Sequence, residues 1–250
     1  MVKILISPIN EEEIIETLKG EPDIIDIKNP KEGSLGASFP WIIKNAYCII
    51  NEYLKSINFK KEIKLSAVIG DFPNLPGSAS LAALGAAVCG ADYIKIGLMG
   101  PSNEEEALNI IKNVVKSVKE YDNNKKVVIS GYADFKYIKK SINPLILPKL
   151  CNYASADVVM VDTAIKNGKS LFDNLSINEI GEFIDISHEY NLEVAIAGSL
   201  KFEDLKIIKK LNPDIIGVRS MVCENFDRNN GKIQSNFIKQ IKYQLNSIYA

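Results

Sequence analysis

Four charged side chains interrupt apolar segments that otherwise have the composition of buried β-strands. They are Asp26 and Lys28 in IIDIK, Lys95 in YIKI and Asp162 in VMVD. Because side chains two positions apart in a strand point to the same face, Asp26 and Lys28 share one face while the intervening isoleucine takes the other. An unpaired ion is costly in an apolar interior. These four groups are therefore expected to pair with one another or to line a polar cavity.

Lysines gathered in one place point to Schiff-base chemistry. Lys166 follows Asp162 by four residues and can project over the same site as Lys28 and Lys95. Neighbouring ammonium groups repel one another, which lowers their pKa values, and a lysine that is uncharged near neutral pH can attack a carbonyl carbon. Asp26 and Asp162 can orient the ammonium groups and transfer protons. The alternative is that these residues form ion pairs with a purely structural role.

Other catalytic chemistries lack the residues that they need. His188, the one histidine, falls late in an amphipathic segment, where a surface position is expected. This excludes a Ser-His-Asp triad and a metal site built from several histidines. The cysteines Cys48, Cys89, Cys151 and Cys223 are far apart and are expected to be reduced and buried. There is also no G-x-G-x-x-G, the motif of dinucleotide binding, after the first strand.

Two glycine-containing turns are candidates for phosphate binding. AGS ends the seventh apolar run with Gly198 and Ser199, and GVRS ends the eighth with Gly217 and Arg219. Backbone N–H groups freed by glycine, together with a guanidinium group, bind phosphate well, and barrels often hold phosphate on the loops after strands seven and eight. Ordinary loop closure is the alternative. GD at 70–71 and GYAD at 131–134 carry further polar groups that suit a site or a turn equally.

The candidate residues lie in or next to eight apolar, β-branched runs that alternate with amphipathic segments. The runs cover residues 3–9, 23–28, 64–70, 93–98, 126–133, 158–163, 193–199 and 215–220. Helical spacing covers residues 11–19, 41–54, 104–121, 177–190, 202–211 and 235–248, and the small residues of 82–91 indicate a closely packed helix. Helix N-caps are expected at Ser102 or Asn103 and at Ser176.

This alternation predicts an α/β protein formed by a single (β/α)8 TIM barrel over residues 1–250. A doubly wound parallel sheet is the alternative. In a barrel, the loops after the strands assemble the active site, and the charged residues are expected at the strand ends that form this mouth. We find no linker, no low-complexity segment and no sequence repeat beyond the alternation itself.

Composition excludes several classes of protein. With 46% hydrophobic and 24% charged residues, a chain of 250 residues can form a large core and is not disordered. Thirty basic and thirty-one acidic side chains give a net charge of -1, which argues against nucleic-acid partners. No apolar segment reaches membrane-spanning length, and the first residues are too short an apolar stretch for a signal peptide. A cytoplasmic location is therefore expected.

With these residues located, the sequence resembles the (5-formylfuran-3-yl)methyl phosphate synthase family, also called 4-(hydroxymethyl)-2-furancarboxaldehyde-phosphate synthase. The similar segments are DIIDIKNPKEGSLGA at 23–37, GADYIKIGL at 90–98, VDTAIKNGKSLFD at 161–173, AIAGSL at 195–200 and DRNNG at 227–231. The first of these is long enough to be specific. GADYIK and AGS occur in many barrels.

The resemblance implies a (β/α)8 lyase that makes the furan precursor of methanofuran, a carrier in methanogenesis and C1 metabolism, from two molecules of glyceraldehyde 3-phosphate. It implies Lys28 as the Schiff-base lysine and Lys95 as the proton acceptor, with Asp26, Asp162 and Lys166 as supporting groups. We expect crowding to keep Lys95 uncharged. Since no step of the implied reaction requires net oxidation or a hydride carrier, we expect no cofactor and no metal. Like many barrels, the protein is also expected to form a homo-oligomer.

Two other functions fit the same residues. A different Schiff-base aldolase acting on a sugar phosphate would use the same lysine chemistry with another acceptor. A non-catalytic barrel that binds phosphorylated metabolites would keep its ions for structure. Trapping of a covalent adduct on Lys28 distinguishes an enzyme from a binding protein, and ultraviolet absorbance of the product distinguishes the two enzymes.

Overall fold

Eight parallel strands close into a barrel in which each strand pairs with its neighbours in chain order, and β8 pairs with β1. This computed structural model describes residues 1–57 and 62–246. It confirms the predicted (β/α)8 barrel and not the doubly wound sheet. The strands are β1 (Lys3–Ile6), β2 (Ile24–Ile27), β3 (Lys64–Asp71), β4 (Tyr93–Gly97), β5 (Lys126–Tyr132), β6 (Val158–Asp162), β7 (Glu193–Ile196) and β8 (Ile215–Val218).

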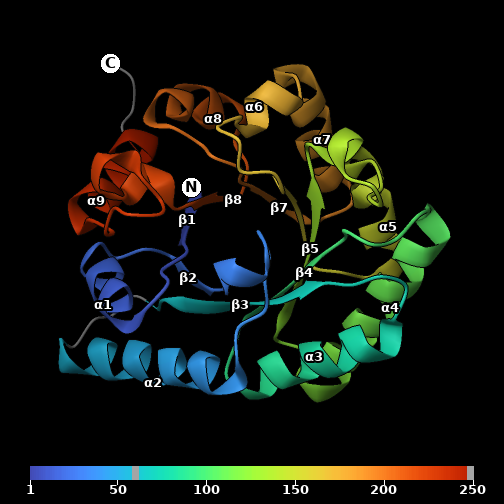
Figure 1. Cartoon of the computed structure of the whole chain (residues 1–250), viewed down its shortest axis with the longest axis horizontal. Coiled ribbons are helices and arrows are strands. Elements are labelled where there is room, and N and C mark those ends of the chain that lie inside the picture. The colour runs from blue at the N-terminus through green and yellow to red at the C-terminus, as the bar shows by residue number, and fades with distance from the viewer. Residues whose placement is uncertain (58–61, 247–250) are drawn as a thin grey trace.

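Helices surround the barrel, and the last one lies beside the first (Figure 1). Contacts between the two ends of the chain include a hydrogen bond of 3.1 Å from the Ser235 N–H to the Glu16 carboxylate, so that the ring of helices closes. The helices are α1 (Glu11–Lys19), α2 (Pro40–Ser56), α3 (Pro76–Val88), α4 (Glu104–Tyr121), α5 (Leu147–Ala154), α6 (Leu171–Asn174), α7 (Ile177–Glu189), α8 (Leu205–Leu211) and α9 (Ser235–Asn246).

Local sequence signals place most element boundaries close to their predicted positions. The Asn103 side chain caps α4 by accepting from the Glu106 N–H, and Ser176 caps α7 in a capping box with Glu179. The small-residue helix begins earlier than predicted, at Pro76, because proline suits the first turn of a helix. α5 and α6 were not predicted, since each is too short to show a clear period. The predicted helix end at residue 248 lies outside the described residues.

An aspartate precedes each even-numbered strand and forms the same contact, which corrects the expectation that the sequence has no repeat. Each carboxylate accepts a hydrogen bond from the backbone N–H of the second residue of the odd-numbered strand that comes before it in the chain. The bonds join Ile4 N to Asp23, Leu65 N to Asp92, Val127 N to Asp157 and Val194 N to Asp214, at 2.8–2.9 Å. These contacts fix the register at the N-terminal end of the barrel four times over.

Apolar clusters lie on both sides of the strands, and a third, small cluster consists of Leu35, Val68 and Tyr132. The outward-facing side chains pack under the helices in the larger core. A smaller cluster fills the lower interior of the barrel, as the layered side chains of such barrels do. Its members are Leu5, Ile24, Tyr93, Val128, Val158, Met160, Ala195, Ala197 and Ile215. Above this layer the interior becomes polar, which is where the chemistry-bearing residues are found.

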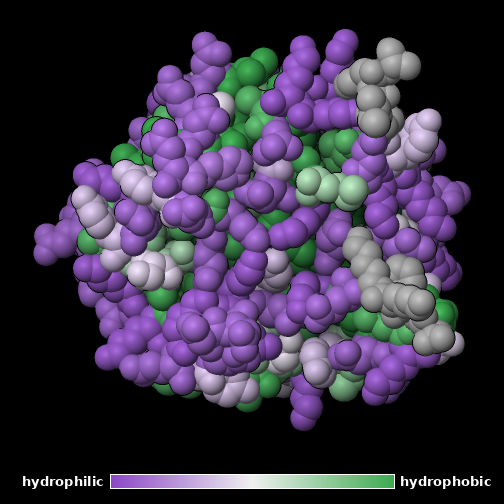
Figure 2. Space-filling view, turned by 180° about the vertical axis from the view of Figure 1, so that it is seen from behind, coloured by the Kyte–Doolittle hydropathy of each residue, from purple (hydrophilic) through white to green (hydrophobic). Residues whose placement is uncertain are grey.

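Most of the face opposite to that of Figure 1 carries hydrophilic side chains, with apolar atoms visible between them (Figure 2). Apolar side chains are also exposed singly or in small groups, including stacked Phe39 and Trp41. Among the described residues, no helix has the length and apolar character required to cross a membrane.

Candidate active site

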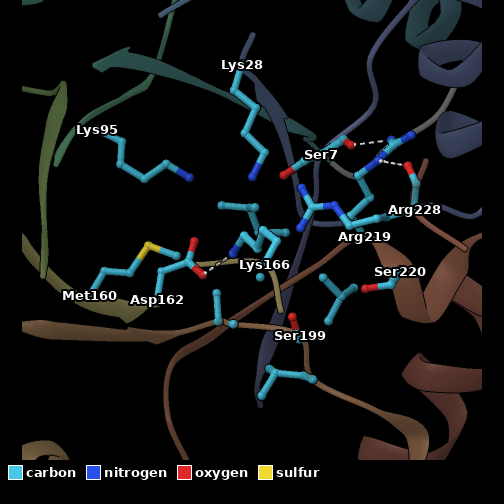
Figure 3. A pocket seen from close by; sticks show the side chains of 16 residues that line it. Ser7, Lys28, Lys95, Met160, Asp162, Lys166, Ser199, Arg219, Ser220 and Arg228 are labelled. Atoms are coloured by element: carbon cyan, nitrogen blue, oxygen red, sulfur yellow. Dashed lines mark hydrogen bonds and ion pairs between the residues drawn. The ribbon is translucent and has the colours of Figure 1, made fainter. Parts of the chain in front are cut away.

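A polar pocket opens at the C-terminal ends of the strands and is lined by Lys28, Lys95, Asp162 and Lys166. Figure 3 shows the amino groups of the three lysines pointing into this common space from β2, β4 and the loop after β6. The structure therefore brings together three lysines that are far apart in sequence. The term "lysine pocket" is used below for this cavity.

Several residues in and beneath the pocket occupy equivalent positions on, or just beyond, the four even-numbered strands. Counted from the aspartate that precedes each strand, the third and fifth residues point into the barrel. The third positions hold Asp26, Lys95, Met160 and Gly217, and the fifth hold Lys28, Gly97, Asp162 and Arg219. Asp26 and Lys95 thus lie one layer below the mouth, which differs from the predicted location of all charged residues at the strand ends. Lys28 lies one residue beyond β2.

Asp26 is fully buried and is the centre of a hydrogen-bonded group. Its carboxylate accepts from the Lys95 amino group at 2.8 Å, from the Ser66 hydroxyl at 2.7 Å and from the Ser7 hydroxyl at 3.1 Å. Burial alone raises the pKa of a carboxyl group, but the charges of Lys95 and Lys28 and these hydrogen bonds hold the pKa of Asp26 below its usual range. Asp26 is thus an anion fixed beneath the pocket.

Lys95 is paired rather than crowded. Its side chain is 2% exposed, and its amino group forms an ion pair with Asp26. We expected Lys95 to be uncharged, whereas the structure places it in a buried ion pair, which requires a charge on both partners. Proton acceptance by Lys95 requires that it first donates its own proton.

Lys28 is the lysine whose charge is disfavoured. Burial, followed by the positive charge of Lys95, lowers the pKa of Lys28 to about 8, although the carboxylates Asp162 and Asp26 act in the opposite direction. Lys166 adds a further, smaller lowering effect. The sequence predicted that neighbouring charges lower the pKa of a lysine. In the structure this lysine is Lys28, and burial lowers its pKa more than the neighbouring charges do.

Lys166 is held over the pocket by the loop that follows β6. Its amino group lies 3.5 Å from Asp162 Oδ1 and 3.1 Å from Thr163 Oγ1. The loop is fastened by Asp134, whose carboxylate accepts from the Ala164 and Ile165 N–H groups at 2.9 and 2.7 Å. Asp134, which the sequence left open between a site and a turn, therefore positions the segment that carries Lys166.

Asp162 is the carboxylate at the mouth itself. Burial raises its pKa, but the charges of Lys166 and Lys28 and a hydrogen bond from the Thr163 N–H outweigh this effect, so that the pKa of Asp162 is lowered. An ionised carboxylate next to two amino groups can orient both and can exchange protons with either.

A tyrosine and an aspartate occupy the space next to Gly97, two positions above Lys95. The Tyr132 hydroxyl lies 2.8 Å from both Asp71 carboxylate oxygens. A Cβ at Gly97 would come within 2.1 Å of Asp71 Oδ1 and 2.7 Å of the Tyr132 hydroxyl, so only glycine leaves room for this pair. Burial, and then the Asp71 charge, raise the pKa of Tyr132 well above its ordinary value.

The glycine turns after β7 and β8 line the same pocket, as expected for a phosphate-binding wall. Gly198, Ser199 and Gly217 are all part of it. Two features require glycine at position 198. Its φ of +110° is rarely adopted by other residues, and a Cβ there would lie only 2.9 Å from Thr163 Cγ2. Ser199 is also in the left-handed region, with φ +50°. Such backbone strain in a non-glycine residue is typical of binding sites.

Arg219 lines the pocket, but its guanidinium group is turned away from it. Nη1 donates to the Ser7 carbonyl at 2.9 Å and to Glu13 Oε2 at 2.7 Å, while Nη2 donates to Glu13 Oε1 at 3.3 Å. Nε donates to the Arg228 carbonyl at 3.3 Å. The Arg219 guanidinium was expected to bind phosphate. Its contacts argue against this role, because Glu13 already neutralises its charge.

Arg228, and not Arg219, places a guanidinium group in the pocket (Figure 3). Its half-buried side chain lines the pocket and reaches into it in Figure 3. Within the described part of the chain, its guanidinium group forms no ion pair within 4.0 Å. Arg228 lies in the DRNNG segment, beyond β8 and outside any strand, so strand periodicity gave no signal for it.

The remaining candidates lie away from the pocket. His188 is exposed and pairs with Asp214 at 2.9 Å, in agreement with a surface role. All four cysteines are free, and Cys151 and Cys223 are buried as expected. Cys89 is only half-buried, and Cys48 is exposed because it lies on the solvent side of α2. In the ranges that the structure describes, no group of three or more His, Cys, Asp or Glu side chains is arranged to hold a metal ion.

Comparisons with known proteins agree with the similarity found in the sequence. A family model described as 4-HFC-P synthase matches residues 4–242. The (5-formylfuran-3-yl)methyl phosphate synthase of Methanosarcina barkeri is 54% identical over 229 residues, covering 92% of this chain and 93% of that protein. The protein of the same name from Methanocaldococcus jannaschii is 50% identical over 239 residues, covering 96% and 97%.

Solved structures with a similar fold have little sequence identity to this chain. KGPDC from Streptococcus mutans has a TM-score of 0.62 and 12% identity, with 100% of both chains covered. Orotidine 5'-monophosphate decarboxylase from Methanocaldococcus jannaschii also has a TM-score of 0.62, with 16% identity and coverage of 99% of this chain and 100% of that one. At this level of identity the likeness shows a shared barrel fold.

Proposed function

The chain belongs to the 4-HFC-P synthase family, and from this premise we propose that it is a (5-formylfuran-3-yl)methyl phosphate synthase that forms a furan from two molecules of glyceraldehyde 3-phosphate. The whole chain acts as one catalytic domain. The observation that carries the mechanism is the lowered pKa of Lys28, about 8, inside a pocket shared with two more lysines. A lysine in this state is suited to attack an aldehyde.

The first step joins Lys28 to one triose phosphate. The uncharged amine of Lys28 adds to the aldehyde carbon and gives a carbinolamine. The ammonium group of Lys95, whose carboxylate partner is Asp26, donates its proton to the departing hydroxyl group, which leaves as water. The products of this step are a protonated imine on Lys28 and an uncharged Lys95.

The second step uses the Lys95 amine that the first step has created. The protonated imine acidifies the adjacent carbon of the triose, and Lys95 removes a proton from that carbon to form an enamine. Asp26 stabilises the recovered ammonium group, so the buried ion pair is intact again. The ion pair of the free enzyme is therefore compatible with Lys95 as proton acceptor.

The enamine then adds to the aldehyde of a second triose phosphate, which forms a carbon–carbon bond. Elimination of one phosphate and two waters, with ring closure and release from Lys28, gives an aromatic furan that keeps the other phosphate. The atoms balance, since two C3H7O6P molecules less H3PO4 and two H2O leave C6H7O6P. Carbon is neither oxidised nor reduced overall, so the reaction requires no redox cofactor. The activity is that of a carbon–oxygen lyase acting on phosphates.

Phosphate is bound where the pocket wall is both positively charged and rich in glycine. Gly198, Ser199 and Gly217 present backbone next to the cavity, and Arg228 adds a guanidinium group without an ion-pair partner among the described residues. Backbone N–H groups and a guanidinium group form charge-assisted hydrogen bonds with phosphate. This arrangement would hold the triose with its aldehyde toward Lys28.

Incubation with glyceraldehyde 3-phosphate tests the proposal. We expect a product of composition C6H7O6P with the ultraviolet absorbance of a conjugated furan aldehyde, and borohydride reduction should add one triose phosphate less one oxygen atom to Lys28. An adduct without an absorbing product would instead indicate another Schiff-base aldolase. Neither adduct nor product would indicate a barrel that only binds phosphorylated metabolites.

A further inference from the structure

A second, larger cavity adjoins the lysine pocket. It lies between the loops that follow β6, β7 and β8 and has a volume of about 440 Å3, compared with about 30 Å3 for the lysine pocket. The two cavities share one wall, which is formed by Lys166, Ser199, Leu200, Ser220 and Arg228. The term "outer cavity" is used below for the larger one. A molecule in the outer cavity is therefore next to whatever Lys28 holds.

Among the described residues, two cations that line the outer cavity, Lys201 and Arg228, form no ion pair. Lys166, Lys201 and Arg228 line it together with Glu203 and Asp227. The Asp227 carboxylate is already occupied, since it accepts hydrogen bonds from two backbone N–H groups and one side-chain amide of the following asparagines at 2.8–3.2 Å. Within the described ranges, neither Lys201 nor Arg228 has a carboxylate within 4.0 Å. These two cations are therefore available to an anionic ligand.

One wall of the outer cavity is aromatic and is held in a strained conformation. Phe202 and Phe226 line the cavity, and Phe237 supports both with ring centroids 6.0 and 5.7 Å away. Asn225 and Phe226 have φ values of +53° and +57°. A bulky residue in this region is rare, and such strain is found mainly where function requires it. The strain here holds an exposed phenyl ring at the cavity wall.

From these features we infer that the outer cavity binds the second triose phosphate, with its phosphate beside Lys201 and its carbon chain along Phe226. This inference rests on the proposed function, which requires two triose phosphates but does not say where the second one binds. Lys28 holds the first triose in the lysine pocket, and the outer cavity is the adjoining space. A triose in the outer cavity would present its aldehyde across the shared wall to the enamine on Lys28, which is the geometry that carbon–carbon bond formation needs.

Lys201→Gln tests this assignment, because Lys201 lines the outer cavity and not the lysine pocket. Two half-saturating concentrations of glyceraldehyde 3-phosphate are measured: one for the borohydride-trapped adduct on Lys28 and one for furan formation. Losing one charge-assisted hydrogen bond to phosphate should raise the value for furan formation about tenfold. The value for the adduct should stay within about twofold of wild type, since its site is unchanged.

Lys206→Gln is the matched control, because it removes the same charge from the exposed face of nearby α8. Phe226→Ala is the second variant and should also raise the furan value selectively. If Lys201→Gln behaves like Lys206→Gln, or if both of its concentrations rise together, the second site is not in the outer cavity. Failure of the proposed function is a separate result, because wild-type enzyme would then form no furan at all.

Discussion

The amino group of Lys95 lies 2.8 Å from Oδ2 of Asp26, and the two residues form a buried ion pair across 69 positions of sequence. The pair occupies the layer below the mouth of the barrel and leaves Lys28, one layer above, as the lysine with the lowered pKa. The two lysines thus differ in their surroundings, because Lys95 has a carboxylate at hydrogen-bond distance, whereas burial and the nearby Lys95 charge disfavour the ammonium form of Lys28.

Replacing Lys28 with arginine should abolish the trapped adduct and furan formation. Arginine keeps the positive charge but does not form an imine under these conditions. Mass analysis after borohydride reduction with glyceraldehyde 3-phosphate measures the adduct, and circular dichroism checks the fold. Turnover at the wild-type rate would show that another residue is the nucleophile.

Adduct formation should increase with pH up to about 8. Only the uncharged amine reacts, and below its pKa of about 8 the uncharged fraction of Lys28 rises about tenfold for each pH unit. Quenching with borohydride at a series of pH values gives the midpoint. Because the Lys166 charge lowers this pKa and the Asp162 charge raises it, Lys166→Met should move the midpoint upward and Asp162→Asn downward. A midpoint near the value of free lysine would contradict the assignment.

Replacing Lys95 with glutamine should leave adduct formation possible and stop condensation. Glutamine cannot accept the proton that enamine formation releases, and loss of a general base typically costs about 100-fold or more in rate. Because the Lys95 charge lowers the pKa of Lys28, the variant should need a higher pH to form the adduct, and the two proteins are therefore compared over a series of pH values. Furan absorbance measures the rate. Unchanged furan formation would remove Lys95 from the mechanism.

Gly97→Ala should destabilise the protein, because the new methyl group would overlap the Asp71 carboxylate and crowd the Tyr132 hydroxyl. A loss of about 1–3 kcal/mol in the free energy of unfolding is expected from such overpacking. Gly85→Ala in α3 is the matched control, since nothing lies within 4 Å of its new Cβ. That change should stabilise the helix by about 0.5–1 kcal/mol. Urea denaturation separates the two, and equal effects would refute the steric argument.

Glu13→Gln should also destabilise the fold, because it leaves the buried Arg219 guanidinium without its counter-charge. The expected loss is about 2–3 kcal/mol in the free energy of unfolding. Glu120→Gln serves as the control, since it breaks an exposed ion pair with Lys116 and should change stability by less than about 1 kcal/mol. Similar losses for the two variants would mean that Arg219 is not held mainly by Glu13.

The sequence by itself determined the barrel and most of its candidate site residues. Eight β-branched runs alternating with amphipathic helices permit few folds, and ions in otherwise dry strands identify interior positions, as with Lys95. Such patterns depend on neighbours a few residues away. They therefore identify which side chains face inward but not which atoms they meet.

Only the tertiary structure decided how those residues are paired. Asp26 neutralises Lys95, Glu13 neutralises Arg219, and Arg228 is the guanidinium that faces the pocket. Each of these relationships joins separate elements or lies on a loop without periodicity. Charge states and hydrogen-bond partners depend on distances of a few ångströms, and such distances are set only when the strands close into a ring.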